Sequence, residues 1–203
     1  MKKIQLLFLF TCLTTASIAQ INEIGIFVGG SNYIGDIGPE TYINPNNIMV
    51  GAMYKWNMNP RIAIRGTFTY SQLSSDDLDS NNAARYQRGI NFTNSLKELA
   101  LGMEFNFLEY NLDDYRTTHT PYLLIEIAAF NYNIAVRETS PEEYEYKAKT
   151  SFAIPFGIGY KTKLYNDFAI ALELRVRYTF EDDLDYNNNS INSLTFGNPN
   201  SND

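Results

Sequence analysis

The stretch FAIALELRVRYTF, residues 168–180, alternates between large apolar residues and small or charged ones. One side of the extended chain carries Phe168, Ile170, Leu172, Leu174, Val176 and Tyr178, and the other carries Ala169, Ala171, Glu173, Arg175 and Arg177. A period of two predicts a β-strand with one apolar face and one charged face. In a water-soluble β-protein the apolar face lines the core. In an outer-membrane barrel it faces lipid, and the charged face fills the lumen.

The N-terminus has the features of a secretory signal peptide. Two lysines precede the apolar run IQLLFLF, and small residues occupy the positions that signal peptidase reads, which predicts cleavage between Ala19 and Gln20. The run is too short and too rich in threonine for a membrane anchor. We therefore assign residues 1–19 to a signal peptide and residues 20–203 to one domain.

The composition of the mature chain excludes several classes of function. The 203-residue sequence has a formal charge of -7, and removal of Lys2 and Lys3 with a signal that contains no acid gives -9. An acidic exported chain without a basic patch is not expected to bind nucleic acid. The only cysteine, Cys12, lies in the signal, which excludes disulfides and Cys-ligated metals. No later apolar run reaches about 18 residues, so any membrane span must consist of strands.

Beyond residue 20 the pattern predicts seven strands separated by connections rich in Pro, Asn, Asp and Gly. No segment of helical period competes with this interpretation. Most of the strands are long enough to cross a bilayer at a tilt, which takes roughly 9–11 residues. The predicted strands cover residues 22–30, 48–56, 61–71, 95–107, 121–131, 151–162 and 168–180.

Three features favour a membrane barrel over a lipocalin-like soluble barrel. The polar face of the strands is rich in Gly and Ala, which suits a narrow barrel interior better than a solvated surface. Short connections at 57–60 and 164–167 alternate with long ones, as periplasmic turns alternate with external loops, and 111–120 is a longer periplasmic turn. Aromatic residues gather near strand ends, as in interfacial girdles: Tyr54, Trp56, Tyr70, Phe107, Tyr110, Tyr160, Phe168 and Tyr178. We expect an all-β, antiparallel up-and-down transmembrane β-barrel in the outer membrane, in contact with its lipid.

The charged face of this barrel points into its lumen. An eight-stranded barrel is only wide enough for side chains to fill it, and buried charges must pair. We therefore expect an Arg–Glu network that closes the lumen, in preference to an ion or proton path. The residues expected to form it are Arg65, Glu98, Glu104, Glu126, Glu173, Arg175 and Arg177.

Seven strands leave the barrel one short of an even number. Bacterial single-chain barrels have an even count, because the closing strand returns antiparallel to the first. The tail 181–203 is polar and contains no predicted strand. We expect a C-terminally truncated barrel whose natural chain continues with an eighth strand after Asp203.

No catalytic or metal-binding constellation is evident. The sole histidine, His119, falls in a predicted periplasmic turn, and the acidic clusters at 74–80, 141–146 and 181–186 lack the spaced acids and glycine of an EF-hand loop. We expect these clusters to be solvated external loops. The sequence predicts no enzyme activity, no cofactor, no metal and no small-molecule substrate.

Four stretches together resemble a known family. They are EIGIFVGGSNYIGDIG (23–38), NPRIAIR (59–65), RYQRGINFTNSLKELALGMEFNF (85–107) and TPYLLIEIAAFNYN (120–133). The set is similar to the DUF6089-type outer-membrane barrel proteins, which resemble PorG of the type IX secretion system. The resemblance implies a non-enzymatic membrane anchor that associates, from its periplasmic side, with a ring of secretion-system lipoprotein and partner protein. The turn at 111–120 is a candidate contact for those periplasmic ring proteins.

The family motif GGSNYIGDIG contains Asn32, Tyr33, Gly35, Asp36 and Gly38. We expect it to form a tight loop that returns over the barrel mouth, in preference to a ligand site. In this interpretation the two later glycines have positive φ, and the aspartate caps a turn.

A second class of function stays open. The external loops at 72–93, 133–149 and 181–203 are acidic, and an adhesin-like barrel would use them to bind a ligand or a surface. A barrel enzyme and a small pore are less favoured, since the external side has no histidine and the lumen is expected to be filled.

Overall fold

The computed structural model describes residues 21–112, 118–137, 144–165, 168–181 and 183–185. In this part of the chain seven strands form one antiparallel sheet in the order β1 to β7, each paired with its neighbour in sequence. The strands are β1 Ile21–Ser31, β2 Asn47–Asn59, β3 Ile62–Asp76, β4 Asn91–Asn106, β5 His119–Arg137, β6 Tyr144–Tyr165 and β7 Phe168–Thr179. The predicted signal peptide and its cleavage site at Ala19 and Gln20 lie outside the described residues.

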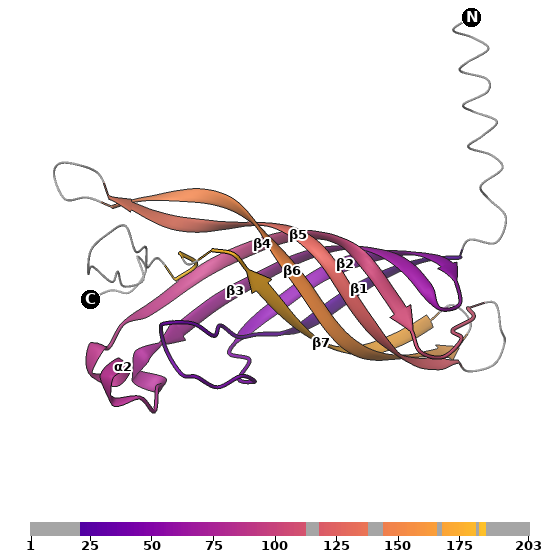
Figure 1. Cartoon of the computed structure of the whole chain (residues 1–203), viewed down its shortest axis with the longest axis horizontal. Helices are drawn as coiled ribbons and strands as arrows, with labels where there is room; N and C mark the ends of the chain where they lie inside the picture. Colours follow the sequence, from indigo (N-terminus) through magenta and orange to yellow (C-terminus); the bar gives the residue numbers. More distant parts are fainter. Residues whose placement is uncertain (1–20, 113–117, 138–143, 166–167, 182, 186–203) are drawn as a thin grey trace, which may run out of the picture.

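The sheet is curled into a half-barrel, with β1–β3 on one wall and β5–β7 on the other (Figure 1). Within the described residues β1 pairs only with β2, and β7 pairs only with β6. An up-and-down sheet of seven strands leaves its two edge strands running in the same direction. The architecture confirms the predicted all-β, up-and-down fold and is consistent with a barrel that lacks one strand.

The four central strands of the sheet, β3–β6, are longer than the sequence predicted. β3 continues to Asp76 and pairs there with Asn91 of β4, and β5 and β6 pair as far as Arg137 and Tyr144. Both ends of the expected loop 72–93 and most of the expected loop 133–149 are therefore sheet, because paired backbone continues past the end of the apolar alternation. The long hairpin β5–β6 projects beyond its neighbours in Figure 1.

The β3–β4 tip contains helical turns that the sequence did not indicate. The 3₁₀ helix η2 Asp77–Asp79 begins where the Asp76 side chain accepts the amide of Leu78. The helix α2 Ala83–Arg88 has Asn82 as its N-cap and ends at Gly89, whose φ of 66° suits a left-handed C-cap. No helix in the described part of the chain is long and apolar enough to cross a membrane.

The alternation predicted from sequence is seen as alternating burial. Along β4 the residues on the inner face are mostly buried, and those on the outer face are exposed. The outer face is apolar from edge to edge: Ile26 of β1 is 88% exposed and Leu172 of β7 is 81% exposed. Tyr110 departs from the predicted girdle, because it is buried at the end of the lumen.

Glycine on the inner face makes room for the larger side chains there. A Cβ at Gly102 would overlap the carbonyl oxygen of Ile125 and the Cα of Glu126 on the adjacent strand, and a Cβ at Gly159 would overlap the ring of Tyr122. Neighbouring inward residues lie directly against these glycines. This close packing explains why the polar face is rich in small residues.

We predict that Gly102→Ala lowers the free energy of unfolding by about 1–3 kcal/mol, since backbone must move to accept the methyl group. The control is Gly66→Ala on the outer face of the adjacent strand β3, where a Cβ would meet no atom within 4 Å. Urea unfolding of the full-length protein in lipid vesicles, followed by fluorescence of the single tryptophan, compares the two variants. Equal midpoints for both would contradict the packing argument.

Candidate functional site

The inner face carries a buried carboxylate that three cations share. The Glu104 carboxylate lies 2.7 Å from the Lys55 ammonium and 3.4 Å from the Arg65 guanidinium, and it accepts a hydrogen bond from Lys161. The three cations come from β2, β3 and β6, and each is almost fully buried. One carboxylate on β4 therefore links strands from both walls of the half-barrel.

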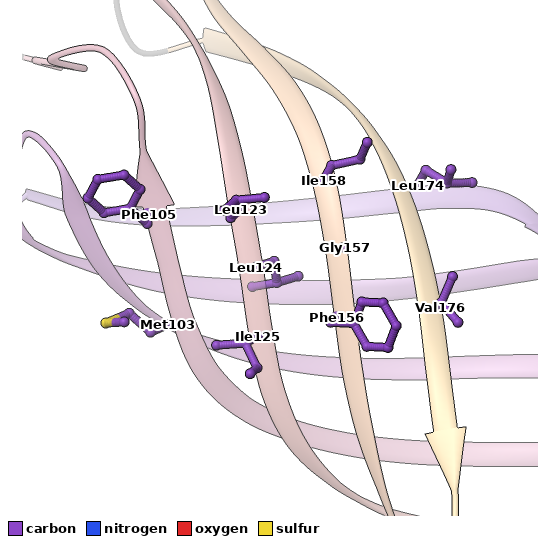
Figure 2. Close-up of a pocket in the computed structure, with 10 residues that line it drawn as sticks. All are labelled: Met103, Phe105, Leu123, Leu124, Ile125, Phe156, Gly157, Ile158, Leu174 and Val176. Carbon is purple, nitrogen blue, oxygen red and sulfur yellow. The ribbon is translucent and has the colours of Figure 1, made fainter.

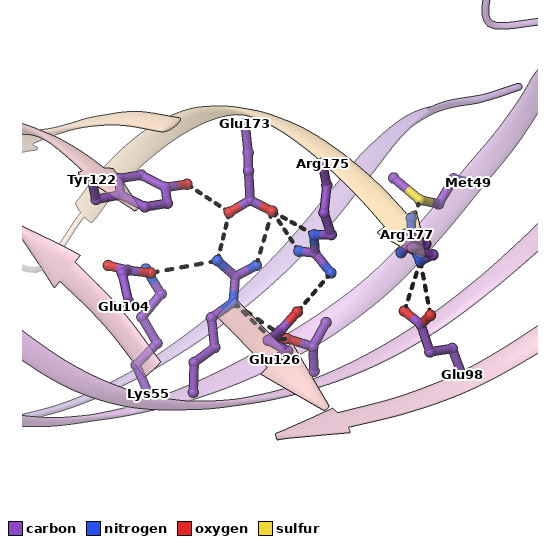
Figure 3. A network of polar contacts seen from close by, with 11 residues as sticks. Met49, Lys55, Glu98, Glu104, Tyr122, Glu126, Glu173, Arg175 and Arg177 are labelled. Atoms are coloured by element: carbon purple, nitrogen blue, oxygen red, sulfur yellow. Dashed lines mark hydrogen bonds and ion pairs between the residues drawn. The ribbon is translucent and has the colours of Figure 1, made fainter. Parts of the chain in front are cut away.

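A second carboxylate joins this group to the edge strand β7. Arg65 donates to Glu173 at 2.6 Å, and the Tyr122 hydroxyl donates to the same carboxylate at 2.7 Å. Arg175 also donates to Glu173 and lies 3.2 Å from the Glu126 carboxylate. Figure 3 draws these contacts around Glu173. Together with the contacts of Glu104 they make one continuous lumenal network of Lys55, Arg65, Glu104, Tyr122, Glu126, Lys161, Glu173 and Arg175.

Glu98 and Arg177 form a separate ion pair, nearer the end of the lumen where residues 183–185 lie. The Arg177 Nε donates to both carboxylate oxygens, at 3.0 and 2.8 Å, and its Nη2 lies 3.9 Å from the Met49 sulfur. The structure thus brings five of the seven sequence-predicted charges into the lumenal network and places the other two in this pair.

Two lysines and one tyrosine of the network were not predicted from the sequence to take part in it. Lys55 and Lys161 share the parity of the inward residues on their strands, so the signal was present in the alternation. Tyr122 lies on β5 directly after Pro121, and its side chain points inward.

The described part of the β4–β5 connection, residues 107–112 and 118, covers one end of the lumen. Its Tyr110 amide donates to the Pro60 carbonyl at 3.1 Å, and the Tyr110 ring lies 4.3 Å from the Lys161 ammonium. Lys163 donates to the Leu112 carbonyl from the adjacent strand. His119 was predicted in the turn; it is instead the first residue of β5, and its ring stacks on Tyr160.

The other end is covered by residues 183–185, which we call the mouth segment. Asp183 accepts hydrogen bonds from Tyr132 and Lys149, the Leu184 carbonyl accepts one from Asn94, and Asp185 accepts one from Tyr33. All three residues of the segment are buried. The expectation that this acidic cluster is a solvated loop was wrong for these residues, because inward tyrosine, lysine and asparagine donors satisfy their oxygens.

The family motif also folds toward the mouth. The Tyr33 ring packs edge-on against Phe92, with centroids 4.8 Å apart, and Ile37 is buried beside Phe92. Gly38 has a φ of 85°, but Gly35 does not have positive φ, so that part of the prediction was wrong. Asn32 donates to the Thr41 carbonyl and closes the loop on itself.

A buried aspartate holds this loop against the β3–β4 tip. The Asp77 carboxylate accepts the Gly38 amide at 2.8 Å, the Ile90 amide at 3.2 Å and the Arg88 guanidinium at 2.6 Å. Burial raises the pKa of Asp77, but these three donors outweigh burial and hold the pKa below its usual value. Asp36 contributes its backbone carbonyl, which accepts from Arg88, where the sequence predicted a side-chain cap.

An apolar depression of about 580 Å³ follows the outer face of β4–β7 (Figure 2). Its wall consists mostly of outward side chains: Met103, Phe105, Leu123, Ile125, Phe156, Ile158, Leu174 and Val176. Among the described residues no group of three or more His, Cys, Asp or Glu side chains is arranged to hold a metal ion.

The family model for Domain of unknown function (DUF6089) matches residues 2–203. The chain therefore belongs to this family, as the four resembling stretches indicated. It matches no curated protein and no solved structure.

We predict that Glu104→Gln lowers the free energy of unfolding by about 3–5 kcal/mol, because it leaves three buried cations without their shared carboxylate. Glu109→Ala is the control: the Arg61–Glu109 pair is exposed and contributes less than about 1 kcal/mol. Urea titration in vesicles measures both. A small effect at Glu104 would show that the cations find other partners.

We predict that acid loosens the motif loop through Asp77. Because the folded-state pKa is lowered, the stabilisation is complete above the ordinary value of about 4 and is lost as pH falls through the lowered pKa. Hydrogen-exchange protection of the Gly38 and Ile90 amides should therefore decrease on acidification. In Asp77→Asn the protection should be weak already at neutral pH and should change little with acid. Protection of the parent protein that is constant with pH would refute the mechanism.

Proposed function

We propose that this chain is a non-enzymatic outer-membrane β-barrel that anchors a protein-secretion machinery of the type IX kind. The observation that carries the proposal is the filled lumen. Fully buried charges fill its centre, and the β4–β5 connection and the mouth segment cover its ends. A barrel with a filled interior has only its outer belt and its two ends with which to act.

The outer face supports a membrane location. Large apolar side chains are exposed on every strand, and burial of apolar surface at about 25 cal/mol per Å² strongly favours lipid over water for such a belt. Trp56 and Tyr160 lie near the strand ends, where an amphipathic ring suits the interface between lipid and water.

The end with short turns offers the surface for periplasmic partners. The β2–β3 turn is closed by the Asn59 side chain, which accepts the amides of Arg61 and Ile62, so it presents a fixed shape. Next to it, Leu108 is 47% exposed on the β4–β5 connection. A preordered turn with an exposed apolar residue suits a protein contact.

The test is a pull-down of the full-length tagged protein from gently solubilised envelopes, with partners identified by mass spectrometry. We expect ring components of a secretion machinery in stoichiometric amounts, and we expect Leu108→Asp to lose them. Leu78→Asp is the matched control, since Leu78 is 55% exposed at the opposite end. Recovery of the folded barrel alone, or equal recovery from both variants, would refute the anchoring role.

A further inference from the structure

The β3–β4 tip and the motif loop form one rigid unit beyond the strands. Arg85 of α2 donates to the carbonyls of Gly35 and Gly38, at 3.0 and 2.8 Å, and lies 3.4 Å from Glu40. Arg88 donates to the Asp36 carbonyl at 2.6 Å. Two arginines of α2 therefore hold the backbone of the motif loop against the helix through three hydrogen bonds.

This unit exposes apolar side chains although it lies beyond the belt. Ile34, Leu78 and Tyr86 are 49%, 55% and 57% exposed. Ile34 and Tyr86 adjoin Gly35 and Arg85, which are hydrogen-bonded to each other. Leu78 belongs to η2, which packs against α2, so the three residues lie in one region. We call these three residues, with Asp36 and Asp79, the cap surface. In Figure 1, α2 lies at the opposite end of the sheet from the β2–β3 turn.

The charges of the cap surface indicate what covers it. Arg85 and Arg88 are engaged with the loop, whereas Asp36 and Asp79 are exposed to solvent. Exposed carboxylates beside apolar residues repel phosphate-bearing lipid headgroups and attract cationic side chains. Tyrosine and aliphatic residues in a preordered setting are typical of the centre of a protein interface.

We propose that the cap surface binds a partner protein on the external side, through a patch in which Lys or Arg side chains surround an apolar centre. This interaction goes beyond the anchoring role, because it lies at the other end of the barrel and uses none of the residues of the periplasmic turns.

The test replaces Tyr86 with p-benzoylphenylalanine in the full-length protein and irradiates intact cells. We expect one discrete protein adduct whose crosslinked peptide carries Lys or Arg beside apolar residues. The double variant Asp36→Lys/Asp79→Lys should reduce the adduct about tenfold by reversing the attraction. Glu109→Lys, which reverses an exposed acid at the opposite end, should leave it unchanged.

Several outcomes would overturn the proposal. They are an absent adduct, an adduct with lipid only, an adduct with a second copy of the chain, and an adduct that does not respond to charge reversal. The ring pull-down separates the two proposals, since the cap variants should retain ring components. Loss of the adduct together with loss of the ring would indicate a failed barrel, which heat-modifiable migration on a gel would detect.

Discussion

The structure depends on the sharing of the buried Glu104 carboxylate by Lys55, Arg65 and Lys161. Charges taken out of water cost several kcal/mol each unless they are paired with good geometry. Because the partners come from three other strands, they meet only when the sheet curls to the observed degree. The pairing therefore makes the charged inner face tolerable and also fixes the curvature of the half-barrel.

Small residues make this arrangement possible. The Cα of Gly102 leaves space for the Glu126 side chain, and Gly159 leaves space for the Tyr122 ring, which donates to Glu173. An inner face of uniformly large residues would hold the walls apart and separate the ion pairs. The mixture of long charged and very small residues on the inner face thus lets the lumen fill without forcing the walls apart.

The sequence predicted the strands and their faces because parity is a local property. It therefore identified Arg65, Glu98 and Arg177 as inward. The pairing partners depend on the curl of the sheet, so parity could not assign Lys161 to Glu104. Burial of the mouth segment was missed for the same reason: its donors Tyr33, Tyr132 and Lys149 precede the acids that they bind by 152, 51 and 34 residues. The acids alone resemble a solvated loop.

The two edge strands are tied to the rest of the sheet by side chains across the lumen. Glu173 of β7 reaches Arg65 of β3, and the Arg175 guanidinium lies 5.8 Å from the Phe27 ring of β1. Within the described residues no ladder joins β1 to β7. An ion pair therefore ties β7 to β3, and a cation–π contact links the inner faces of the two edge strands without backbone pairing between them. A strand that runs antiparallel to both edges would meet a surface whose curvature and charge are already determined.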